Sequence, residues 1–163
     1  MATKHDILVS WLNDAYAMEQ NLIEVLESQV KHAEEHPEIK RHLETHLEET
    51  QRHSEIVEEC LHRLDSDSSA GKKLIGKMTG WVQGAGSSAS DDALVKDCLA
   101  GYSMEHFEIA SYRSLVAAAE EAGETEVAEA CRAILQDEQR MAEFLEQQIP
   151  RVTQMHLSQQ AAV

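Results

Sequence analysis

Apolar residues recur every three or four positions along four long stretches of the chain, with polar residues between them. This is the spacing of one face of an α-helix, which makes a turn in 3.6 residues. The pattern predicts helices over approximately residues 4–35, 37–64, 91–122 and 125–149. The stripe of the first of these helices contains Leu8, Val9, Leu12, Tyr16, Ile23, Leu26 and Val30.

Residues that favour helix ends lie at the limits of these stretches. Thr3 followed by Asp6 resembles a capping box at the start of the first helix. Pro37 suits the first turn of the second helix, and Gly123 is a C-cap signal after the third. Pro150 has no backbone N–H group and is predicted to end the fourth helix.

The lengths of the connections predict the topology. Short turns separate the first helix from the second and the third from the fourth, whereas the Ser- and Gly-rich residues 65–90 form a long crossover. Two hairpins joined by a crossover make an antiparallel four-helix bundle, so we predict an all-α protein with a single domain over residues 1–163 and a tail over 150–163. The crossover contains a short amphipathic, helical piece that we expect to cover the bundle, with a dimer contact as the alternative: Leu74, Ile75, Met78, Trp81 and Val82.

The two halves of the chain resemble each other. The motif Tyr-x-Met-Glu ends at Glu19 and again at Glu105, 86 residues later. A second match, at an offset of 88, pairs Thr50 with Glu138. The repeat agrees with a bundle built from two equivalent hairpins.

Composition and charge narrow the function classes. The chain has 163 residues, of which only 4% are aromatic, and a formal net charge of −16. This charge repels phosphate backbones, and we expect no nucleic-acid partner and favour cations; solubility alone is the alternative explanation of the acidity. No stretch approaches the ~20 apolar residues of a membrane-spanning helix, and three widely spaced cysteines are typical of a reduced compartment, so we expect a cytoplasmic protein without a membrane partner.

Acidic residues fall where the helices should bury apolar ones. Glu19, Glu105 and Glu138 lie at the centres of the predicted inner faces, and Thr50 with His53 takes the same place on the second helix. Buried carboxylates without partners cost several kcal/mol, so bound protons or bound metal ions must neutralise them. Carboxylates with one or two imidazoles suit iron or manganese better than zinc or calcium.

These positions resemble those of the ferritin-like proteins, which build a two-metal site from two single Glu residues and two Glu-x-x-His motifs. Glu19 and Glu105 match the single Glu positions. Each Glu-x-x-His motif is half present, as Thr50 with His53 and as Glu138 with Met141.

More narrowly, the stretches 46–50 and 105–112 look like the YciF and YciE bacterial stress proteins, a ferritin-like family. The resemblance covers most of positions 4–149. It implies a four-helix bundle, a homodimer and a role in stress.

The resemblance and the inward acids together define the candidate residues. The predicted ligands of one or two iron or manganese ions are Glu19, His53, Glu105, Glu108 and Glu138. Residues expected to support them, or to act as alternative ligands, are Glu49, Asp137, Tyr16, Tyr102 and Thr50. His46 is expected to be structural.

Two functions remain open. One is a stress protein whose iron or manganese centre reduces peroxide or oxygen or oxidises ferrous iron. The alternative is a non-enzymatic stress protein with a decayed or structural metal site, acting through dimerisation or partner binding.

Overall fold

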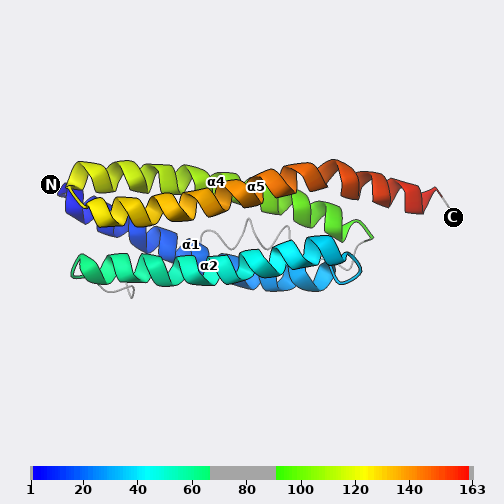
Figure 1. Ribbon diagram of the computed structural model, residues 1–163, viewed down its shortest axis with the longest axis horizontal. Coiled ribbons are helices and arrows are strands. Elements are labelled where there is room, and N and C mark those ends of the chain that lie inside the picture. Colours follow the sequence, from blue (N-terminus) through cyan, green and yellow to red (C-terminus); the bar gives the residue numbers. More distant parts are fainter. Residues whose placement is uncertain (1, 67–90, 162–163) are drawn as a thin grey trace.

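The computed structural model describes residues 2–66 and 91–161, and the described chain folds into four long helices (Figure 1). Helix α1 comprises Lys4–His32 and α2 comprises Pro37–Arg63; α4 comprises Ala93–Ala122 and α5 comprises Thr125–Gln160. Helices α1 and α2 form one antiparallel hairpin, and α4 and α5 form the other. The hairpins pack so that α1 lies against α4 and α2 against α5. The predicted all-α, antiparallel four-helix bundle is confirmed.

The predicted helix ends agree with the observed ones to within three residues at most positions. The capping box of α1 is present, because the Thr3 hydroxyl accepts from the Asp6 N–H and the Asp6 carboxylate accepts from the Thr3 N–H. Gly123 ends α4 with a φ of 81°, a conformation that glycine adopts without strain. The short helix expected in the crossover, and the role expected for Trp81, fall on residues outside the described chain.

The prediction that Pro150 ends the fourth helix is wrong. Helix α5 continues through Pro150 to Gln160, so most of the expected tail is helical. Pro150 and Glu146 are both exposed, so the Glu146 carbonyl that loses its partner can bond to water. Val152, two residues later, is buried in the apolar core and holds the helix against the bundle.

Two apolar clusters fill the bundle on either side of a polar layer. The first contains Leu12, Val57 and Ile134, and the second contains Leu26, Leu43 and Leu145. Along every helix the candidate residues fall between members of the two clusters, as Glu19 does between Leu12 and Leu26. The packing of both clusters therefore fixes the four helices around a buried polar layer.

No helix in the described part of the chain is both long enough and apolar enough to cross a bilayer.

Candidate metal centre

The polar layer contains ionisable side chains from all four helices, and they are almost completely buried. Glu19 of α1, His53 of α2 and Glu138 of α5 each expose 0% of their surface, and Glu108 of α4 exposes 1%. His46 of α2 and Glu105 of α4 are buried beside them. All five predicted ligands therefore lie in one layer.

One group of possible ligands consists of Glu19, His53 and Glu138, with ligand atoms within 4.8 Å of one another. His53 Nδ1 lies 2.8 Å from Glu138 Oε1 and 4.0 Å from Glu19 Oε2. Three different helices supply these atoms.

A second group consists of His46, Glu105 and Glu138, again with ligand atoms within 4.8 Å of one another. His46 Nε2 lies 3.2 Å from Glu105 Oε1 and 3.6 Å from Glu138 Oε2. Glu138 thus presents one oxygen to each group. The two groups share this carboxylate and form one continuous polar centre.

The carboxylates of the layer are short of hydrogen-bond partners. Among the described residues, five buried carboxylate oxygens of the layer have none, and His53 Nδ1 also lacks one. The five oxygens are Glu19 Oε2, Glu105 Oε2, Glu108 Oε2 and both oxygens of Glu138. Because buried polar atoms are nearly always satisfied in folded proteins, this concentration of unsatisfied acceptors indicates that a cation or protons complete the layer.

Burial and the charges of neighbouring carboxylates raise the pKa values of Glu19, Glu105 and Glu108, which favours their neutral forms. Loss of solvation, followed by the charge of Glu138, raises the pKa of Glu19 from 4.5 to about 8. Loss of solvation also raises the pKa of Glu105 to about 7 against the opposing effect of His46. The pKa of Glu108 rises well above its ordinary value through burial and through the charges of Glu138, Glu19 and Glu105. Without a cation, the folded layer retains protons that an unfolded chain would release.

The pKa values of the two buried histidines, His46 and His53, are also raised. Burial lowers the pKa of His46, but the neighbouring carboxylates, led by Glu105, outweigh it and the net pKa lies well above 6.5. For His53, Glu138 outweighs burial in the same way and raises the pKa. Both imidazoles therefore favour a positive charge while the layer holds no other cation.

His46 has a larger part in the layer than the structural role predicted for it, because its Nε2 faces Glu105 and Glu138. The spacing of His46, Thr50 and His53 does place the three on one helix face, so the signal was present in the sequence. Which of them approach a carboxylate depends on the rotation of α2 against α4 and α5.

The tyrosine that contacts the layer is Tyr112. Its hydroxyl is completely buried and donates a short hydrogen bond to Glu19 Oε1. Tyr16 and Tyr102, the expected partners of site carboxylates, instead pack as partly buried side chains against the first and second apolar clusters. Tyr112 lies seven residues, two helical turns, after Glu105, which is the sequence signal for a residue on the same face.

Glu49 and Asp137 lie behind the two histidines. Glu49 Oε2 is 3.4 Å from His46 Nδ1, and Asp137 Oδ2 is 3.1 Å from His53 Nε2. Each histidine therefore has one ring nitrogen toward a supporting carboxylate and the other toward the buried layer. Such outer carboxylates orient histidine ligands in metalloproteins, which is the supporting role predicted for both residues.

Thr50 and Met141 occupy the positions at which the two Glu-x-x-His motifs are incomplete. The buried Thr50 hydroxyl donates to the His46 carbonyl at 2.9 Å and so bonds within its own helix. Met141 is buried in the second apolar cluster. Neither side chain contributes a carboxylate or an imidazole to the layer.

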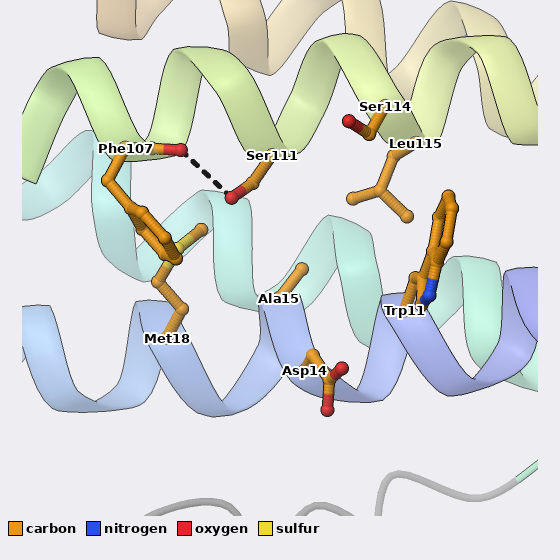
Figure 2. A pocket seen from close by; sticks show the side chains of 8 residues that line it. All are labelled: Trp11, Asp14, Ala15, Met18, Phe107, Ser111, Ser114 and Leu115. Atoms are coloured by element: carbon orange, nitrogen blue, oxygen red, sulfur yellow. Dashed lines mark hydrogen bonds between the residues drawn. The ribbon is translucent and has the colours of Figure 1, made fainter. Parts of the chain in front are cut away.

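A groove of about 290 Å³ follows the outer surface between α1 and α4 (Figure 2). Trp11 and Leu115 line one end and Met18 and Phe107 the other, with Ala15 between them. Met18 and Phe107 directly precede Glu19 and Glu108 in sequence. The end of the groove at Met18 and Phe107 is therefore level with the polar layer.

The chain is similar to several proteins of known structure. A protein from Xanthomonas campestris is 36% identical, and the match covers 98% of this chain and 99% of that one with a TM-score of 0.82. The Escherichia coli stress protein YciF is 22% identical over 94% of this chain and 99% of its own, with a TM-score of 0.74.

Symerythrin from Cyanophora paradoxa, in a crystal reduced with dithionite, is a more distant structural match. It is 17% identical over 93% of this chain and 86% of its own, with a TM-score of 0.59. YciF and symerythrin support the ferritin-like fold alone.

The family comparison agrees with the fold and with the resemblance to YciF-type proteins. The model of a domain of unknown function, DUF892, matches residues 3–158, which is nearly the whole chain. The protein therefore belongs to the DUF892 family, and its fold is ferritin-like.

Proposed function

We propose that this protein binds two iron or manganese ions in the polar layer of the bundle and acts in the response to oxidative or general stress. The observation that carries the proposal is the set of five unpartnered carboxylate oxygens buried together with two histidines. Glu19, His53 and Glu138 would hold one ion. His46, Glu105 and Glu138 would hold the other.

The residues present fit such a centre. Ferritin-like two-metal sites use four carboxylates and two imidazoles. This layer also has four buried carboxylates and two imidazoles, because Glu108 and His46 offset the residues missing at Thr50 and Met141. The donor set therefore supports two ions although each Glu-x-x-His motif is incomplete.

The chemistry of the donors supports iron or manganese. Carboxylate oxygens combined with imidazole nitrogens are typical of iron and manganese sites, whereas structural zinc sites favour thiolates. The three cysteines are buried in or beside the apolar clusters, away from the carboxylates. Calcium is coordinated by oxygen atoms and makes no use of two inward histidines.

When bound, iron or manganese would supply the redox chemistry for reducing peroxide or oxygen, or iron would itself be the substrate that is oxidised. The protein's part is to hold the carboxylates in place and to exclude bulk water. Tyr112 holds one oxygen of Glu19, which leaves Oε2 free for the layer. The apolar clusters above and below keep the layer dry.

The second candidate is a non-enzymatic stress protein with a structural ion. The absence of a carboxylate at Thr50 and of an imidazole at Met141 favours it, because both motifs depart from the ferritin-like pattern. Such a protein would act through its surface, for example as the homodimer that the YciF resemblance implies.

The test is elemental analysis of untagged protein from cells supplied with both iron and manganese. We expect close to two ions per chain in the wild type. Absence of both metals from the wild type, and from metal-free protein incubated with either ion at micromolar concentration, would overturn the proposal. If metal is bound, peroxide reduction and ferrous-iron oxidation by the wild type and by Glu105→Gln decide between the two candidates.

A further inference from the structure

One exposed arginine, Arg140 of α5, connects the carboxylates behind the two histidines. Its Nη2 donates to Asp137 Oδ1 through a short hydrogen bond and to Glu49 Oε1 at 3.5 Å. Asp137 precedes Arg140 on α5 by almost one turn, whereas Glu49 belongs to α2. Arg140 therefore joins two helices as well as two carboxylates.

Each of the two carboxylates uses one oxygen to contact Arg140 and the other to contact a histidine. Asp137 uses Oδ1 for Arg140 and Oδ2 for His53 Nε2, 3.1 Å away. Glu49 uses Oε1 for Arg140 and Oε2 for His46 Nδ1, 3.4 Å away. Two chains of contacts thus run from one guanidinium group to the two imidazoles of the layer.

Arg140 offers its positive charge to two acidic side chains at once, because its Nη2 contacts both Asp137 and Glu49. Each of these carboxylates also contacts the outer ring nitrogen of its histidine and can accept an N–H bond there. An accepted bond at the outer nitrogen directs the other nitrogen of each ring, as a neutral base, into the layer.

We infer that Arg140 is a positioning residue that sets the orientation of both histidine ligands, His46 through Glu49 and His53 through Asp137. This inference rests on the proposed metal centre and adds to it a determinant of affinity outside the ligand set. The alternative is that Arg140 makes an ordinary surface ion pair, which adds little to the stability of the protein and leaves metal binding unchanged.

The experiment titrates metal-free protein with Mn(II), followed by electron paramagnetic resonance of free and bound Mn(II). We expect Arg140→Met to weaken binding of both ions by about 10-fold, the lower end of the range for loss of outer partners, and to broaden the spectrum of the bound ions. Arg140→Lys should restore most of the affinity, because a single donor nitrogen contacts both carboxylates. Melting temperatures measured without metal separate a loss of fold from a loss of affinity.

Two arginines serve as matched controls. Arg52 Nη2 lies 3.1 Å from Asp137 Oδ2. Because Asp137 supports only His53, Arg52→Met should affect one ion at most. Arg132 pairs with Glu120, away from the layer, and Arg132→Met should bind Mn(II) as the wild type does.

The outcomes separate this inference from the proposed function. Absence of Mn(II) and Fe(II) binding by the wild type overturns both. Two ions in the wild type and unchanged affinity in Arg140→Met overturn the inference alone. If Arg140→Met does not fold, Glu49→Gln and Asp137→Asn take its place, and wild-type affinity in both of these variants overturns the inference.

Discussion

His53 Nδ1 lies 2.8 Å from Glu138 Oε1, and neither atom has a hydrogen-bond partner among the described residues. The two atoms are at ion-pair distance when the imidazole is protonated. Both side chains are fully buried. Under the proposed function, these two atoms would be ligands of a common cation.

Glu138 is the shared residue of the centre, and its replacement should have the largest effect on metal content. Glu138→Gln removes a carboxylate that faces both ligand groups, so we predict loss of both ions. Glu19→Gln removes a ligand of one group only and should retain about one ion per chain. Elemental analysis of the three proteins under identical loading gives the comparison. Equal metal content in Glu138→Gln and the wild type contradicts the assignment of the shared ligand.

His46 should be a ligand and not merely a packing residue. His46→Gln keeps a polar side chain of similar length but loses the imidazole that faces Glu105 and Glu138. We predict loss of the ion held by Glu105 with retention of the ion near His53, measured as a drop from two ions to one.

His42→Gln is the control for this variant. His42 lies one turn earlier on the same helix, is exposed, and stacks on Phe144 at a ring-centroid distance of 3.8 Å. Its replacement should leave the metal content unchanged. The same loss of metal in His42→Gln and His46→Gln would assign the effect to the helix and not to the imidazole.

The stability of the metal-free protein should fall as the pH rises. The pKa of Glu19 is raised from 4.5 to about 8 and that of Glu105 to about 7. A carboxyl group with a raised pKa contributes stability that is fully present below the unfolded value of 4.5 and lost as the pH rises through the folded value. The raised pKa values of His46 and His53 act in the same direction.

We therefore predict a melting temperature several degrees higher at pH 5.5 than at pH 8 for metal-free protein, measured by circular dichroism. Manganese should reverse the trend, because its ligands must be deprotonated. A metal-free melting temperature that is higher at pH 8 than at pH 5.5 would contradict the proposed protonation of the layer.

Tyr112 should stabilise the metal-free bundle through its bond to Glu19. Tyr112→Phe leaves a fully buried carboxylate oxygen without its donor, and such losses cost about 1–3 kcal/mol. Urea unfolding at pH 8 measures the change. Tyr16→Phe is the control, because Tyr16 packs against the apolar cluster and should lose little free energy of unfolding. Equal effects of the two substitutions would show that the Glu19 bond contributes nothing.

The three cysteines should be unreactive in the folded protein. Burial raises the pKa of Cys60 and of Cys98 to about 11 and that of Cys131 to about 12, so very little thiolate is present at neutral pH. We predict slow reaction with Ellman's reagent in buffer and rapid reaction of all three thiols in urea. Rapid modification of the native protein would contradict the described packing.

The sequence predicted the helices well because each helix carries its own apolar stripe and most of its end signals. Pro150 was misread because a proline on an exposed face can be accommodated when the next turn, here with Val152, is held by packing. Helix-stop signals such as proline reflect the preferences of an isolated helix, and tertiary packing can override those preferences.

The candidate centre was predicted only in part. The repeat identified Glu19, Glu105 and Glu138, because identical inward positions recur in both halves of the chain. His46, Tyr112 and Arg140 were not predicted as members of the centre, because their contacts cross from one helix to another. Such contacts depend on the rotation and axial shift of packed helices, which a single sequence does not specify.

A two-metal centre is tested most directly by a crystal structure of metal-loaded protein, with anomalous diffraction measured at the iron and manganese absorption edges. We predict two anomalous peaks in the polar layer, one between Glu19, His53 and Glu138 and the other between His46, Glu105 and Glu138. Absence of any anomalous peak in this layer, in crystals grown with both metals, would rule out the proposed centre.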